Sequence, residues 1–396
     1  MRMQTNPFNH PVHLNEALKG FSCIRCGHQL PVGDYQEGCP SCADGEEPSS
    51  LAAVYQETFS SADWQVAGRG RGMARFGAML PYRSFPTLGE GDTPFLEDRR
   101  LAADLGVNEL YLKNEFQNPT GSHKDRMSAL VCARALDLGG RSVVAASSGN
   151  AGASLAAYAA AAGLPCTIVT THNVAPTWRE AIEITGAKML YANNAKTRWL
   201  IVSDLVRNEG FLSATNFLVP PVGSNPYGVE GYKTVAYEMH EERPDALDAI
   251  VVSMARADLL WGIFQGYRDL IAAGLASKMP RLFAVEPYPR LTRVLAGEPQ
   301  AGDFPGTTRM SSIAGSTVTY QAVDAVKGSK GGAVAVDDAE TEAARKEMGR
   351  RGVYLEMSAA ATVAGLRKLL AQGELSGKTR VALVATSSGY KDPSLK

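Results

Sequence analysis

Short apolar runs alternate with helical patterns over most of the chain, and this alternation predicts the fold class. The apolar, β-rich runs are residues 142–146, 166–170, 249–253, 281–285 and 380–385, and the helical patterns lie near residues 151–162, 176–185 and 259–273. Strands that alternate with helices favour α/β architecture, with parallel sheets covered by helices on both faces. Ligands of such sheets bind at the carboxyl ends of the strands, where the connecting loops collect.

Composition narrows the class of protein. The chain has 396 residues, 45% of them hydrophobic and 20% charged, with a net charge of −1. This length favours two lobes, and the charge gives no reason to expect nucleic acid or an anionic membrane as partner. Apolar stretches such as residues 154–163 are too short to span a bilayer, and residues 1–20 lack a secretory signal. We therefore expect a cytoplasmic protein.

The first of three loops that carry candidate chemistry is residues 118–126, with the sequence NPTGSHKDR. Asn-Pro and Thr-Gly interrupt regular structure, and a helical pattern begins near Lys124. The positive end of a helix dipole disfavours the charged form of a lysine, and a neutral amine is the form that attacks an aldehyde. Taken alone, the loop is equally compatible with a surface turn and a solvated lysine.

Two further polar loops follow predicted strands. Residues 147–152 (SSGNAG) open a helix, and their hydroxyls, side-chain amide and N–H groups suit a carboxylate or a phosphate. The alternative is an ordinary helix cap with glycines for tight packing. Residues 386–389 (TSSG) come directly after the last predicted strand, where a hydroxyl could hydrogen-bond a pyridine nitrogen. The alternative is a polar strand end.

Four cysteines fall within twenty residues. Cys23-x2-Cys26-x12-Cys39-x2-Cys42 has the spacing of a four-thiolate zinc ribbon. Four ligands leave no open coordination position, so we expect a structural metal. Disulfides are the alternative, which a cytoplasmic setting disfavours. Cys132 and Cys166 stand alone in apolar surroundings and are predicted core residues.

The order of the motifs resembles the fold-type II family of pyridoxal phosphate enzymes, and most closely the threonine synthases. The resemblance covers nearly all of residues 80–392. It rests on residues 88–94 (LGEGDTP), 118–126, 147–150, 225–227 (NPY), 230–234 (EGYKT), 356–360 (EMSAA) and 388–392 (SGYKD).

This resemblance implies a role for each candidate residue. Lys124 would be the Schiff-base lysine and, once freed, the general base for the substrate α-proton. Asn150 would contact the ring hydroxyl of the cofactor, and Thr386 would face the pyridine nitrogen, leaving that nitrogen largely unprotonated. The substrate would be bound by four further residues: Thr93, Ser147, Ser148 and Gly149.

The sequence pattern and the resemblance together imply the domain organisation. A loosely attached arm (1–20) and a zinc-ribbon-like segment (21–45) would precede the catalytic unit. A large cofactor lobe would comprise residues 46–126 and 231–396, and a small lobe residues 127–230, with the cofactor in the cleft. The resemblance also suggests a homodimer.

Two departures from the family pattern limit how far the resemblance can be carried. The loop after residues 249–253 is Met-Ala-Arg-Ala-Asp (254–258), without the glycines that let backbone N–H groups approach a phosphate. Arg256 is predicted to bind the cofactor phosphate instead, the alternative being an ion pair with Asp258 or Asp269.

The second departure concerns the residues with which threonine synthases bind the phosphate of O-phosphohomoserine. Two polar residues and an arginine are replaced here by Val222, Gly223 and Gly228. We therefore expect a leaving group that is not phosphate, or one that is held differently. His123, beside the lysine, is expected to pack against the cofactor or a neighbouring helix, the alternative being that it tunes Lys124 or assists proton transfer.

The sequence thus predicts elimination or replacement at the β or γ carbon of an amino acid. True threonine synthase, a β-replacement synthase and an ammonia-lyase remain alternatives. A catalytically silent binding protein is the alternative from another class.

Overall fold

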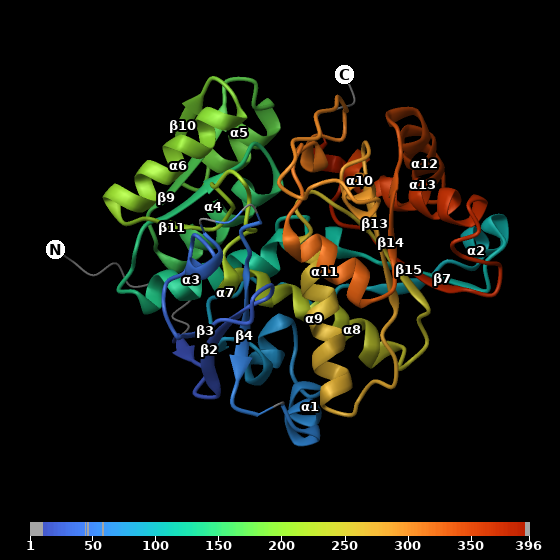
Figure 1. Ribbon diagram of the computed structural model, residues 1–396, viewed down its shortest axis with the longest axis horizontal. Coiled ribbons are helices and arrows are strands. Elements are labelled where there is room, and N and C mark those ends of the chain that lie inside the picture. The colour runs from blue at the N-terminus through green and yellow to red at the C-terminus, as the bar shows by residue number, and fades with distance from the viewer. Residues whose placement is uncertain (1–10, 44, 46, 58, 393–396) are drawn as a thin grey trace. The chain divides into compact units, whose positions relative to one another are not determined.

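The computed structural model describes residues 11–43, 45, 47–57 and 59–392, and these residues divide into two compact units (Figure 1). The first unit contains the residues up to Asp92, with Asn118–Thr120 and Lys124–Tyr232. The second contains Thr93–Gln117, Gly121–His123 and the residues from Lys233 onward. We describe each unit by itself.

The first unit contains three sheets with the helices around them. Its strands are β1 (His13–Leu14), β2 (Leu18–Cys23), β3 (Gln29–Pro31), β4 (Leu51–Tyr55), β5 (Tyr82–Ser84), β8 (Val143–Ala146), β9 (Cys166–Thr171), β10 (Lys188–Ala192) and β11 (Leu212–Ser213). Its helices are α1 (Ser61–Ala67), α3 (Lys124–Asp137), α4 (Asn150–Ala162), α5 (Pro176–Glu183), α6 (Ala195–Glu209) and α7 (Pro226–Val229).

A four-stranded parallel sheet in the order β10-β9-β8-β11 forms the centre of this unit. Side chains alternate between its faces because successive residues of a strand point in opposite directions. Val144 and Val169 pack with Val202 and Leu205 of α6, while Ile168 lies on the other face, against Gly152 of α4. Helices therefore cover both faces, as the alternating pattern predicts.

A smaller antiparallel sheet, in the order β3-β2-β4, carries the first pair of cysteines. It packs inside the first unit, since Phe21 is fully buried and its ring lies 4.8 Å from that of Tyr227 in an edge-to-face contact. The hydroxyl of Tyr227 donates to the carbonyl of Gly33 at 2.9 Å. The cysteine-bearing segment (residues 21–43) is thus anchored to α7.

The second unit is built on a six-stranded sheet in the order β14-β13-β12-β15-β7-β6. Its strands are β6 (Phe95–Glu97), β7 (Glu109–Lys113), β12 (Ala249–Ser253), β13 (Arg281–Glu286), β14 (Gly332–Ala335) and β15 (Arg380–Val384). Its helices are α2 (Arg99–Leu105), α8 (Lys233–Glu242), α9 (Asp258–Ala272), α10 (Leu291–Leu295), α11 (Tyr320–Gly328), α12 (Asp338–Arg350) and α13 (Met357–Ala371). All neighbouring strands are parallel except β6 and β7.

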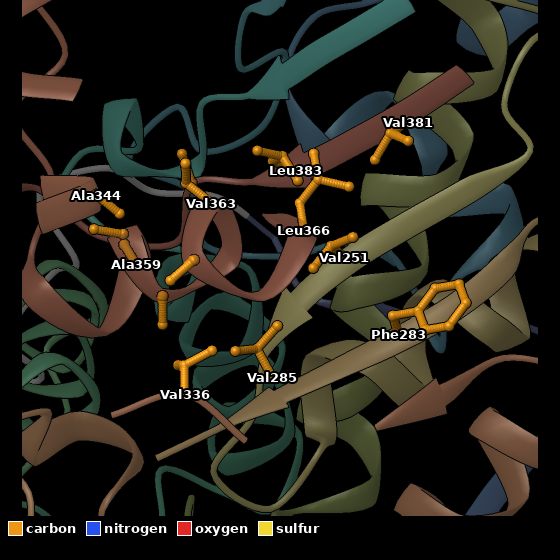
Figure 2. Packing of buried hydrophobic residues seen from close by; sticks show 14 of the residues in the cluster. Val251, Phe283, Val285, Val336, Ala344, Ala359, Val363, Leu366, Val381 and Leu383 are labelled. Carbon is orange, nitrogen blue, oxygen red and sulfur yellow. The ribbon is translucent and has the colours of Figure 1, made fainter. Parts of the chain in front are cut away.

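The core of the second unit lies between this sheet and helices α12 and α13. Figure 2 shows Val363 and Leu366 of α13 near Val251, Val285 and Leu383 of the strands. All five are buried. Burying an aliphatic side chain of this size contributes about 1.5–3 kcal/mol, so this apolar layer fixes the strand ends from which the candidate loops leave.

The predicted α/β class and the predicted strands and helices are confirmed to within one or two residues. Part of the predicted arm, residues 1–10, lies outside the described residues, and residues 13–14 and 18–20 belong to β1 and β2. The lobe boundaries derived from the resemblance stay a prediction. No helix in the described part of the chain has the length and apolar composition needed to cross a bilayer.

Candidate active site

The carboxylate of Asp125 holds the loop that precedes Lys124. It accepts hydrogen bonds from the N–H of Thr120 at 2.7 Å, from the hydroxyl of the same threonine at 2.5 Å, and from Ser154 at 2.6 Å. Asp125 is fully buried in the first turn of α3. Since Ser154 belongs to α4, this carboxylate links the helix that begins at Lys124 to the helix that begins at Asn150.

Lys124 is half-buried at the N-terminus of α3. Its Nζ lies 5.6 Å from the centre of the Tyr232 ring, which is fully buried. The positive end of the helix dipole and the aromatic ring of Tyr232 both lie next to this amine. The sequence therefore correctly placed Lys124 at a helix start.

The loop between β8 and α4 is held by one of its own hydroxyls. Ser147 accepts hydrogen bonds from the N–H groups of Gly149 at 3.2 Å and Gly152 at 2.9 Å. The Trp178 ring lies over the loop, because a Cβ built at Gly149 would come within 3.6 Å of it. The hydroxyl of Ser147 therefore binds two N–H groups at the start of α4, and the Trp178 ring packs beside Gly149.

Ser148 has partners that local sequence reasoning missed. Its hydroxyl oxygen accepts a hydrogen bond from Nη1 of Arg198, on α6, and another from Oγ1 of Thr170, on β9, both at 2.9 Å. Arg198 lies 50 residues further along the chain, inside α6. Only the parallel pairing of β8 and β9 and the packing of α6 bring these groups together.

In the second unit, Thr386 lies two residues after the end of β15 and is almost fully buried. Its carbonyl accepts a hydrogen bond from the N–H of His123 at 3.0 Å, and the His123 Nδ1 lies 3.2 Å from the same oxygen. Oγ1 of Thr386 lies 3.5 Å from Oγ of Ser253, at the end of β12. The residue before Lys124 is thus tied to the end of the last strand.

The loop after β12 has its carbonyl groups fixed by side chains from distant elements. Arg290, fully buried, donates to the carbonyls of Met254 at 2.8 Å and Ala255 at 3.4 Å. Oγ1 of Thr319 and Nε2 of Gln321 donate to the carbonyl of Arg256, at 2.7 and 2.8 Å. Three consecutive carbonyls therefore point into the body of the second unit.

Thr93 donates a 2.7 Å hydrogen bond to Glu115, and both side chains are buried. Its carbonyl accepts from Lys113, which also pairs with the buried Glu238 at 2.6 Å. The hydroxyl thus has a protein partner inside the second unit. Its predicted contact with substrate stays a prediction.

The three positions that depart from the threonine synthase pattern are all buried. A Cβ at Gly228 would lie 2.7 Å from Val131 and 2.8 Å from Met127, both on α3. Val222 is buried and lies against Gly38 of the cysteine-bearing segment. Gly223 has a φ of 125°. The space beside Gly228 is therefore filled by apolar atoms.

The four clustered cysteines come together in the first unit. Their Sγ atoms all lie within 4.8 Å of one another, and the Cys23–Cys42 and Cys26–Cys39 pairs are each 3.8 Å apart. Four sulfurs around one zinc ion, each at about 2.3 Å, are separated by about 3.8 Å in a tetrahedron. The donor set therefore fits a tetrahedral metal, and the separations are much longer than the roughly 2.05 Å of a disulfide.

Comparison with known proteins agrees with this geometry. Residues 86–387 match the model of the family described as pyridoxal-phosphate dependent enzyme. The chain belongs to this family.

Named relatives of this pyridoxal-phosphate dependent enzyme include several threonine synthases. The chain is 30% identical to that of Methanosarcina acetivorans over 383 residues, 94% of this chain and 92% of the relative. It is 34% identical to that of Mycobacterium tuberculosis over 310 residues, 78% and 84% of the two chains. The predicted resemblance is confirmed.

Solved structures show the same fold at lower identity. Maize serine racemase matches with a TM-score of 0.63 and 22% identity, over 75% of this chain and 88% of that one. An O-ureido-L-serine synthase matches with a TM-score of 0.62 and 24% identity, over 76% and 90%. These enzymes confirm the fold-type II architecture.

The loop after β12 fits the cofactor phosphate of this family although it has no glycine. In a trans peptide the N–H of the next residue points opposite to the carbonyl. Fixing the carbonyls of residues 254–256 therefore turns the N–H groups of residues 255–257 away from the body of the unit. Ala257 has a left-handed φ of 64°, directly before α9. Such a turn at a helix start is a concavity that favours anions.

Arg256 adds a cation to this turn. Burial lowers the pKa of its guanidinium, and Asp258 opposes that shift. The guanidinium still carries its charge at neutral pH, because the pKa of an arginine is very high. Asp258 itself accepts a 2.7 Å hydrogen bond from Gln321.

The left-handed Ala257 generates a stability prediction. Ala257→Gly should raise the free energy of unfolding by about 1 kcal/mol, because glycine adopts this φ without the steric penalty of a Cβ. Ala273, at the other end of α9, has a right-handed φ of −78° and is the matched control. Ala273→Gly should lower the free energy of unfolding. Denaturant titration measures both, and equal losses would contradict a strained Ala257.

Proposed function

We propose that this protein is a threonine-synthase-like lyase that eliminates or replaces a group at the β or γ carbon of an amino acid. The observation that carries the proposal is the position of Lys124, at the start of α3 in a loop held by the buried Asp125. The family match and the threonine synthase relatives support it.

Each candidate residue has a proposed task. Lys124 carries the cofactor and moves the α-proton at its Nζ. Asn150 and Thr386 orient the cofactor ring, while Arg256 and the N–H groups of residues 255–257 bind its phosphate. When bound, pyridoxal phosphate supplies an electron sink for charge that develops at the α-carbon. The loop of residues 147–149 binds the substrate carboxylate.

We further propose that the leaving group is not phosphate. Binding a dianion requires cations or several N–H donors, and each lost charged hydrogen bond costs about 1.5–3 kcal/mol. At Gly228, Met127 and Val131 occupy the space that a longer side chain would need. True threonine synthase is the second candidate, favoured by the relatives that cover 94% of the chain.

A structural zinc ion held by Cys23, Cys26, Cys39 and Cys42 completes the proposal, supported by the spacing of the sulfur atoms. A cytoplasmic location stays a prediction from the sequence, and a homodimer stays a prediction of the family resemblance.

The role of Lys124 is tested on the purified protein. We expect an absorbance band at roughly 410–430 nm, and borohydride treatment should leave the cofactor attached to the peptide that contains Lys124. Lys124→Ala should lose this band and lower turnover by at least roughly 10²–10⁴-fold, since it removes the proposed base. The exposed Lys196→Ala on α6 is the control and should behave as wild type. A label on another lysine would refute the assignment.

The leaving group is tested by steady-state assay. The enzyme should convert O-phosphohomoserine to threonine far more slowly than it turns over the non-phosphorylated amino acids that it accepts. Threonine formation at an ordinary rate would identify a true threonine synthase.

As a structural check, Gly228→Arg should cost about 1–3 kcal/mol of stability by overpacking, and the added change Met127→Gly should recover part of it.

The metal is tested by elemental analysis. We expect one zinc ion per chain, lost in Cys26→Ser together with a lower melting temperature, because one of four ligands is removed. Cys166→Ser, outside the cluster, should keep its zinc. Full metal content in the Cys26→Ser variant would argue against the four-thiolate site.

A further inference from the structure

The hydroxyl of Ser148 has both of its acceptor positions filled. A serine hydroxyl offers two acceptor lone pairs and one donor hydrogen. Nη1 of Arg198 and Oγ1 of Thr170 donate to the two lone pairs, each at 2.9 Å. Ser148 is therefore left with its hydrogen, which no acceptor takes in the hydrogen bonds found among the described residues.

We propose that Arg198 and Thr170 make Ser148 a dedicated hydrogen-bond donor to the α-carboxylate of the substrate. This inference rests on the proposed function and adds a positioning residue and a substrate requirement to it. The substrate must carry an ionised carboxylate, because a carboxylate only accepts hydrogen bonds. An amide at the same place is neutral and accepts more weakly.

The neighbouring serine cannot take this task through its side chain. Ser147 accepts from Gly149 and Gly152 and donates to the carbonyl of Gly149 at 3.4 Å. Its hydroxyl closes the turn at the start of α4. The two adjacent serines thus have different tasks: the first holds the loop and the second contacts the ligand.

The positive charge of Arg198 selects for an anion at this position. A hydrogen bond from a cation polarises the hydroxyl that accepts it, so the hydrogen of Ser148 becomes a stronger donor. Arg198 is half-buried and Thr170 is fully buried, so water screens these bonds less than surface pairs. Thr170 also stops the hydroxyl from rotating to accept elsewhere.

Ligand binding tests the inference separately from turnover. The holoenzyme is titrated, by calorimetry and by the cofactor spectrum, with L-serine, L-threonine and L-homoserine and with the amide of each. Wild type should bind at least one acid more tightly than its amide. Arg198→Met should weaken acid binding by about ten- to hundred-fold, as expected for a hydrogen bond to a charged group, and leave amide binding unchanged.

Further variants isolate the route of the effect. Arg198→Lys should bind the acid more tightly than Arg198→Met does, because it keeps a cation. Thr170→Val should lose acid affinity several-fold. Arg207→Met is the matched control, because Arg207 lies on the same helix and pairs with the exposed Glu37. It should bind both ligand classes as wild type does.

A double variant decides whether Arg198 acts through the serine. The Ser148→Ala, Arg198→Met double variant should bind the acid no more weakly than Ser148→Ala alone. If the losses of acid affinity in the two single variants multiply in the double variant, Arg198 acts directly or independently of Ser148, and the proposal is overturned. Equal loss of acid and amide binding, or no preference for the acid in wild type, would also overturn it. Failure of the proposed function looks different: the cofactor band or its attachment to Lys124 would be missing, while calorimetry would still report the acid preference.

Discussion

Parallel pairing of neighbouring strands is the constraint on which both units depend. β8 pairs with β9, and β12 with β15, so the carboxyl ends of paired strands lie at one edge. The loops that begin at Ser147, Met254 and Thr386 follow such ends. Because α4 and α9 start directly after two of these loops, the sheets also determine which helix N-termini are available for anions.

The sequence predicted the features that depend on neighbouring residues. The strands, the start of α3 at Lys124 and the gathering of four cysteines all follow from local patterns and short spacings. Contacts between distant segments could not be found in this way. Arg198 reaches Ser148 only through the packing of α6, and Gln321 reaches the carbonyl of Arg256 across 65 residues. The individual roles inferred from the resemblance remain predictions.

The loop after β12 illustrates how one physical requirement can be met by different residues. Glycine normally lets a backbone turn its N–H groups toward an anion. Here the carbonyls are held from behind by Arg290, Thr319 and Gln321, and Ala257 accepts an unfavourable φ. The cost of that φ, about 1–2 kcal/mol for a residue with a Cβ, is offset by these buried hydrogen bonds. A loop without glycine can therefore keep a glycine-like shape.

The cysteine-bearing segment packs against the rest of the first unit and is not a removable attachment. Phe21 packs on Tyr227, Gln36 accepts from the N–H of Ser213, and Val222 lies against Gly38. Deleting the residues before residue 50 would expose these aromatic and aliphatic surfaces to solvent. Evolutionary loss of the segment would therefore require simultaneous resurfacing of α7 and β11, so the two regions are expected to change together among natural variants.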